Sequence, residues 1–238
     1  MRPGRRCIAV LSLLGGLMFS ISAYAGISVG STRVIFDASQ SALAVPIQNG
    51  DNRPYLVQSW VDDQSGQKAP FLVTPPLVRV DAKKSMTLKI ISTGAMALPQ
   101  DRESVFYLNV KEIPPKAETE NVLQLAIRTR IKFFYRPAQL QGTAADAPAQ
   151  LQWRIAPDEQ GRLALEVSNP SAYAVTVVDA SANGAPLRND MVLPQSKLRY
   201  PLPAAAGDAV AVSFSAMNDF GGVTAPITLQ ARRAATTP

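Results

Sequence analysis

Hydrophobic and polar residues alternate in short runs along most of the chain after residue 25. The two-residue period and the many β-branched and aromatic side chains predict β-strands with unlike faces. Turn-forming sequences such as 51–54 and 64–66 separate the runs, and each run is too short for a stable helix. The runs in the first half are 26–36, 42–49, 55–63, 71–76, 77–82, 86–91, 104–115 and 122–135.

A second series of runs follows a change in composition. Residues 138–150 are mainly small and polar, and we interpret them as a connection between two domains. About seven strands per half, at sandwich spacing, predict an all-β protein with two immunoglobulin-like β-sandwich domains in tandem, over residues 26–140 and 141–238. The later runs are 151–156, 162–169, 172–183, 197–202, 209–218 and 223–233.

The first 25 residues are expected to be a cleaved signal peptide. Three arginines among the first six residues precede an apolar run over residues 7–21, and Ala23-Tyr24-Ala25 follows it. This is the order of a secretory signal, and we expect cleavage after Ala25. The run of about 15 residues is shorter than the roughly 20 that a membrane-spanning helix needs. The mature chain is then exported, is not inserted in a membrane and contains no cysteine, because Cys7 is removed.

Composition excludes several kinds of chemistry. The 238 residues include 24 Lys and Arg, 18 Asp and Glu and no His, for a formal net charge of +6. Without imidazole, a His-based nucleophilic triad, a His-ligated zinc and a His general base are excluded. The chain shows no phosphate-binding loop, nucleophile elbow or metal-ligand cluster, and Asp62 and Asp63 are interpreted as a solvated turn. We expect no enzymatic activity and no cofactor or metal.

The net charge also bears on nucleic acid as a partner. Removing residues 1–25 takes away three basic and no acidic residues, so the mature chain has 21 basic and 18 acidic residues and a net charge of +3. Export and this small charge argue against binding to nucleic acid.

One predicted strand, Val122–Tyr135, is unusually long. At about 3.3 Å per residue it spans more than about 40 Å, so we expect it to extend beyond its own sheet. Its odd positions are largely apolar and its even positions are mainly basic from Arg128 onward. One interpretation is an amphipathic edge strand with solvated charges. The other is that Leu123, Leu125 and Ile127 are offered to another protein that lacks a strand.

Several sequence blocks favour the second interpretation because the chain resembles the PapD-like periplasmic pilus-assembly chaperones. The short connection before the predicted long strand is similar to that of the family's short-loop subfamily. The resemblance implies two immunoglobulin-like domains joined at an angle, with a cleft between them. The matching blocks are STRVIFDA (31–38), RPYLVQSWVDD (53–63), TPPLVRVDA (74–82), RESVFYLNVKEIPP (102–115), IRTRIKFFYRP (127–137) and MNDFGG (217–222).

The resemblance implies that the protein is a chaperone that binds, folds and caps pilus subunits in the periplasm. Each subunit is a sandwich without its last strand, and the chaperone fills the groove by donor-strand complementation. By motif position, Leu123, Leu125 and Ile127 are the donor residues. Arg33 and Lys132 correspond to the basic pair that binds the terminal carboxylate of the subunit.

The same resemblance implies two further sets of residues. Glu103, Arg136 and Asp219 match charged positions that bridge the two domains. A first-domain patch would face the outer-membrane usher that receives the subunits, although core packing and turn chemistry are competing explanations for its members. We also expect homodimers that cover the donor residues when no subunit is bound. The patch comprises Leu56, Gln58, Pro75, Pro76 and Ile113.

An alternative class is a secreted immunoglobulin-like adhesive or structural pilus component. Such subunits share the sandwich class and the export signal. They typically carry a disulfide and an N-terminal donor extension, whereas this chain has no cysteine after residue 25 and passes directly into a predicted strand. These two features favour the chaperone.

Overall fold

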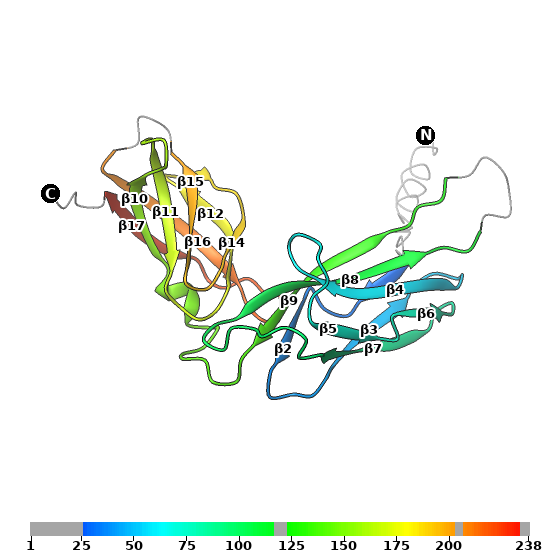
Figure 1. Cartoon of the computed structure of the whole chain (residues 1–238). Coiled ribbons are helices and arrows are strands. Elements are labelled where there is room, and N and C mark those ends of the chain that lie inside the picture. The colour runs from blue at the N-terminus through cyan, green and yellow to red at the C-terminus, as the bar shows by residue number, and fades with distance from the viewer. Residues whose placement is uncertain (1–25, 117–122, 203–206, 234–238) are drawn as a thin grey trace, which may run out of the picture.

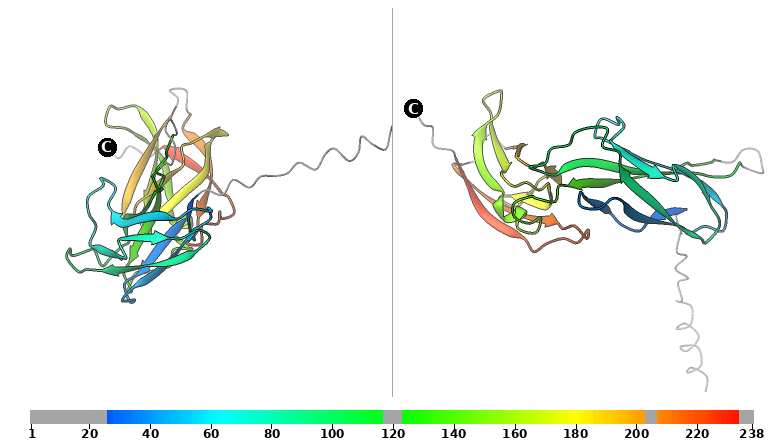
Figure 2. Two further views of the ribbon diagram at one scale, coloured as in Figure 1. Left: turned by 90° about the vertical axis from the view of Figure 1, so that its right-hand side faces the viewer. Right: turned by 60° about the horizontal axis from the view of Figure 1, so that its bottom comes forward.

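A computed structural model describes residues 26–116, 123–202 and 207–233 (Figure 1). The described residues form two β-sandwich domains and one short 3-10 helix, η1 (Ala147–Gln150). Figures 1 and 2 show the domains end to end and at an angle. Within these ranges no helix is long and apolar enough to cross a membrane. The predicted signal peptide lies outside the described residues.

The first domain contains two facing sheets. One has the strand order β1-β3-β7-β5 and the other has the order β2-β9-β8-β4-β6. Apolar residues at every second position face the space between the sheets, as the alternation predicts. The strands are β1 (Ile27–Val29), β2 (Arg33–Asp37), β3 (Leu43–Asn49), β4 (Tyr55–Asp62), β5 (Phe71–Thr74), β6 (Leu77–Val80), β7 (Ser85–Ser92), β8 (Ser104–Ile113) and β9 (Arg128–Arg136).

An aromatic cluster forms the centre of the first core. Phe71 lies between the rings of Phe106 and Phe133, with ring centroids 5.3 and 4.7 Å apart, in edge-to-face contacts. Phe36 of β2 packs against Phe71 at 5.6 Å. Such contacts add about 0.5–1.5 kcal/mol per pair beyond area burial. The cluster therefore joins β5 of one sheet to β2, β8 and β9 of the other.

The second domain is built around one long path of strands, β13-β12-β16-β17-β10-β11-β15, with β14 beside β12. Trp153, Tyr200 and Phe214 pack together in its core. The strands are β10 (Gln152–Pro157), β11 (Leu163–Asn169), β12 (Val175–Ala182), β13 (Ala185–Pro186), β14 (Asp190–Val192), β15 (Ser196–Pro201), β16 (Ala209–Met217) and β17 (Ile227–Arg233).

Two expectations about the chain path need correction. The segment 138–150 is more than a connection between two domains, because its end forms η1 and Ala147 is fully buried in the second core. The run 26–36 divides into β1 and β2, which join different sheets. The Thr74-Pro75 peptide bond is cis, a point that the sequence left open.

Candidate functional site

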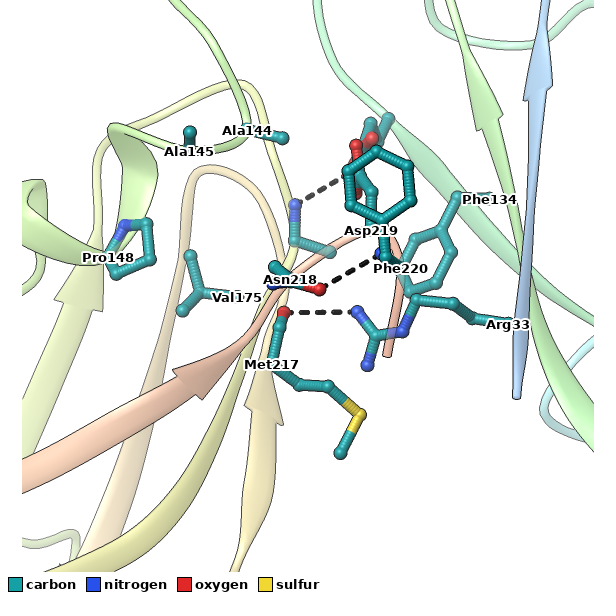
Figure 3. A pocket seen from close by; sticks show the side chains of 12 residues that line it. Arg33, Phe134, Ala144, Ala145, Pro148, Val175, Met217, Asn218, Asp219 and Phe220 are labelled. Carbon is teal, nitrogen blue, oxygen red and sulfur yellow. Dashed lines mark hydrogen bonds between the residues drawn. The ribbon is translucent and has the colours of Figure 1, made fainter. Parts of the chain in front are cut away.

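Two basic side chains on adjacent strands face the second domain. Arg33 begins β2, Lys132 lies in β9, and the parallel register makes these residues direct partners. Register neighbours project to the same face of a sheet. The Arg33 Nη1 donates to the Met217 carbonyl at 3.1 Å (Figure 3), and the Lys132 Nζ donates to the Thr176 Oγ1 at 3.1 Å. Both acceptors belong to the second domain, so the cations lie in the interdomain cleft.

Neither cation forms an ion pair within the described residues. Arg33 is buried, and its Nε has no hydrogen-bond partner there. Burial lowers the pKa of Arg33, although the charges of Asp219 and Glu103 act in the opposite direction. Burial and the charge of Arg33 lower the pKa of Lys132, with Asp190 opposing. The pair is therefore an uncompensated positive site, and a bound anion would stabilise both charges.

Two cavities in the cleft adjoin these cations. The larger, about 560 Å³, is lined by Lys132, Thr176 and Tyr107 together with residues of the β14–β15 region. The smaller, about 250 Å³, is lined by Arg33, Phe134 and residues of the loop after β16 (Figure 3). A chain end that enters the cleft can therefore approach both charges.

The donor stripe, Leu123, Leu125 and Ile127, lies immediately before β9. Their exposed fractions are 85%, 66% and 48%, which is unusual for large aliphatic side chains so close together. The Glu112 amide donates to the Ile127 carbonyl at 2.9 Å, so the stripe is tied to β8 at its end. An exposed apolar stripe in line with a strand offers both an apolar face and backbone groups to a partner.

The predicted strand 122–135 is longer than the paired one. Among the described residues, strand pairing covers only Arg128–Arg136, and residues 123–127 belong to no strand. Residue 122 lies outside the described ranges. The reason for the difference is that strand structure requires a hydrogen-bonded neighbour, and no described strand pairs with 123–127.

A charged network connects the two domains at the other end of β9. Arg136 donates from Nε to Glu103 Oε1 at 2.7 Å, and from Nη1 and Nη2 to the two oxygens of Asp219 at 2.7 and 3.0 Å. Glu103 also accepts from the Ala174 amide at 2.9 Å. Burial lowers the pKa of Arg136, but bonds and charges of the two carboxylates outweigh it, so the pKa lies above its ordinary value. The guanidinium thus bridges a first-domain and a second-domain carboxylate.

Asp62 is not a solvated turn residue, and this interpretation was wrong. It ends β4 with 2% exposure and accepts from the Trp60 Nε1 at 3.2 Å. Arg128 and Arg130 donate to its two oxygens at 3.3 and 3.1 Å, and the Arg130 guanidinium lies 3.8 Å from the ring centroid of Tyr107. The first residues of β9, next to the donor stripe, are therefore held in place by one buried carboxylate.

The five residues of the predicted usher-facing patch lie at the far end of the first domain. Leu56 pairs with Ile113 in register, and Gln58 pairs with Leu77. Leu56 and Leu77 are 45% and 55% exposed, so Leu77 extends the patch although the sequence reasoning missed it. The sequence signal that could have identified Leu77 was the alternation of apolar and polar residues in the short run 77–82. The remaining predicted members, Pro75 and Pro76, are in the β5–β6 turn, half-buried and exposed respectively.

Comparison with known proteins places this geometry in a family. Residues 26–141 match the family described as pili and flagellar-assembly chaperone, PapD N-terminal domain. Residues 146–228 match pili assembly chaperone PapD, C-terminal domain. The chaperone protein LpfB of Salmonella typhimurium is 40% identical over 222 residues, covering 91% of this chain and 94% of LpfB.

Solved structures agree with the sequence matches. The periplasmic chaperone SfaE has a TM-score of 0.71 and 34% identity, covering 85% of this chain and 98% of SfaE. The Salmonella enterica SafB chaperone, solved in complex with the SafA pilin, has a TM-score of 0.76 and 29% identity, covering 87% of this chain and 96% of that chain. Since the two family models span both domains in order, the chain belongs to the PapD-like family of pilus-assembly chaperones.

Proposed function

We propose that this pilus-assembly chaperone captures pilus subunits by lending them its donor stripe. The observation that carries the proposal is the continuity of one chain segment. The exposed stripe, Leu123, Leu125 and Ile127, leads directly into β9, which carries Lys132 beside Arg33 in the cleft. A single bound subunit would therefore contact the apolar stripe and the cationic site at a fixed spacing along the same segment of the chaperone.

The stripe supplies the affinity in this proposal. Burial of a large aliphatic side chain contributes about 1.5–3 kcal/mol, so three contribute roughly 5–9 kcal/mol before ordering costs. Backbone pairing with the subunit would extend its incomplete sheet by one strand. In the free protein we infer that a second copy covers the same residues, which gives a self-capping homodimer.

The cationic pair sets the register. A strand in a groove can slide by two residues without exchanging its faces. The terminal carboxylate of the subunit, bound by the guanidinium of Arg33 and the ammonium of Lys132, would prevent sliding. The half-buried cleft strengthens this contact because the charges are partly removed from water.

The interdomain network keeps the cleft in shape. Arg136 joins Glu103 and Asp219 across the domain boundary, so the second domain is held at the end of β9. With the domains oriented beforehand, less ordering is needed when a subunit binds. We assign the surface of Leu56, Gln58, Pro75, Pro76 and Ile113 to contact with the outer-membrane usher.

The proposed location is the periplasm, after cleavage of a signal peptide at Ala25. The SfaE relative is a periplasmic chaperone, and the sequence order of residues 1–25 is that of a secretory signal. We further propose that the protein acts without catalysis or a cofactor. Folding of the subunit on the donor strand would supply the driving force.

Co-purification from the periplasm tests the function. The chain is expressed with a pilus subunit encoded nearby, either complete or without its last residues. We expect a one-to-one complex with the complete subunit and none with the truncated one. A complex that survives truncation would refute the carboxylate site, and failure to bind any such subunit would refute subunit capture.

A further inference from the structure

The second domain carries a basic sheet face outside the cleft residues that anchor a subunit. Arg154 of β10, Glu166 of β11 and Arg199 of β15 are direct register partners, and Arg232 of β17 lies beside Arg154. They form one row across four strands, about 15 Å long at the usual strand spacing. Lys197 lies two residues from Arg199 on the same face. We call these four basic residues and Glu166 the basic face.

The basic face keeps a surplus of positive charge. Glu166 is fully buried and accepts from Arg154 at 2.6 Å and from Arg199 at 2.9 Å, with the Lys197 Nζ 3.5 Å away. Burial raises the pKa of Glu166, but these cations outweigh it and the pKa lies below its ordinary value. One carboxylate therefore meets three cations. The fourth cation, Arg232, has no ion-pair partner among the described residues. The face has a net charge of +3.

The rest of the domain has the opposite charge. Residues 141–238 contain seven basic and eight acidic residues, so outside the basic face three basic and seven acidic residues remain, a net charge of −4. The three basic residues outside the face, Arg162, Arg188 and Arg233, are each paired with an aspartate. All the unneutralised positive charge of this domain is therefore on one sheet face.

Protection of a sheet edge explains only part of this arrangement. β15 is the last strand of its sheet, and basic residues on edge strands prevent unwanted strand pairing. This accounts for Lys197 and Arg199. It does not account for Arg154 and Arg232, which lie on the interior strands β10 and β17.

The composition of the face favours a lipid surface over a protein. Protein interfaces usually have an apolar or aromatic centre. The neighbours of the basic residues on this face are small or polar, and the large apolar side chains of the same strands point into the core. The other residues of the face are Gln152, Ala156, Ala164, Ser168, Pro201, Thr228 and Gln230.

We propose that the basic face binds the anionic phospholipid surface of a bilayer. A broad β-sheet face with several long basic side chains can place them at a membrane together, without insertion. Each basic residue near an anionic surface contributes about a five-fold gain in partitioning. A surplus of three charges gives weak, reversible and salt-sensitive attachment. This activity goes beyond subunit capture, and the basic face does not include Arg33 or Lys132; of its four basic residues, Lys197 also lines the larger cavity of the cleft.

Vesicle sedimentation with the mature full chain tests the proposal. The probes are phosphatidylcholine vesicles with and without one third phosphatidylglycerol. The variant is Arg232→Glu, which changes the face by two charges. The matched control is Arg233→Glu, which makes the same change one residue further on the opposite side of the pleat, where Arg233 pairs with Asp208. Subunit capture in solution is measured for all three proteins.

We expect binding only to the anionic vesicles and its loss at about 1 M salt, where the screening length is about 3 Å. Arg232→Glu should weaken binding by about 30-fold, and Arg233→Glu by much less. Both variants should capture subunits normally, so a failure here is separate from a failure of the proposed function. Equal loss in both variants, equal binding to neutral vesicles, or stronger binding to an acidic peptide than to anionic vesicles would overturn the proposal.

Discussion

Replacing Lys132 by methionine separates subunit binding from the stability of the free protein. The ammonium makes one hydrogen bond, to Thr176, which is worth about 0.5–1.5 kcal/mol. Burial and the charge of Arg33 disfavour the same ammonium, so its removal also relieves an unfavourable interaction that opposes the loss of the hydrogen bond. We expect the free energy of unfolding to stay within about 1 kcal/mol of wild type, a change in Tm of at most about 4 °C.

Binding should respond far more strongly. In the complex, loss of one member of a desolvated charged contact costs about 2–5 kcal/mol. This corresponds to a subunit affinity about 30- to 4,000-fold lower. The assay mixes unfolded subunit with equimolar wild-type and variant chaperone and measures the share of each in the complex by size exclusion and mass spectrometry.

Lys89→Met is the control because Lys89 is exposed on β7, in the other sheet of the first domain. It loses the same charge and should compete equally with wild type. If Lys132→Met captured as much subunit as this control, the cationic pair would not bind the subunit. If Lys132→Met unfolded instead, the ammonium would be needed by the fold and the account of its electrostatics would be wrong.

Three further outcomes are expected. Leu125→Glu should have a free energy of unfolding within about 0.5 kcal/mol of the wild-type value, because Leu125 is 66% exposed. The variant should nevertheless form no complex with a subunit. If the variant were unfolded, Leu125 would belong to the core of its own domain. Asp219→Asn should weaken the interaction with Arg136 by about 1–3 kcal/mol. The two domains should then sample a wider range of relative orientations, which small-angle scattering measures. An unchanged scattering profile would contradict the bridging role. Because the pKa of Glu166 is lowered in the folded state, its stabilisation is present above about pH 4.5 and lost as the pH falls through the folded pKa. Glu166→Gln should thus be less stable at neutral pH with a flatter acid melting profile, which thermal unfolding from pH 3 to 7 checks.

The misreading of Asp62 shows where local sequence reasoning stops. Two adjacent acids at the end of a strand are typical of a solvated turn. Asp62, however, projects from the same strand face as Trp60 and meets Arg128 and Arg130 from β9. The excess of arginine in a distant run was the only sequence signal. It does not say which acid lies opposite, because that depends on the strand order β9-β8-β4.

The donor stripe was more accessible to sequence reasoning. Alternation alone identified an apolar side over Leu123, Leu125 and Ile127, and the structure leaves these residues exposed. Alternation does not distinguish a face that packs on its own core from one offered to a partner. Ile131 and Phe133 also occupy odd positions of this run, but Phe133 lies in the first core and Ile131 packs against it. The same run therefore contains both exposed apolar residues and core residues.

The sequence by itself determined the all-β character, the series of strands and the absence of imidazole chemistry, because alternation and composition are local properties of the chain. Only the tertiary structure decided which charges are neighbours. Arg33 and Lys132 are far apart in the sequence and adjacent because β2 and β9 pair in parallel. Arg154 and Arg232 gather in the same way through β10 and β17. The physical reason is that strand pairing and register, which set side-chain proximity across a sheet, depend on contacts between distant segments.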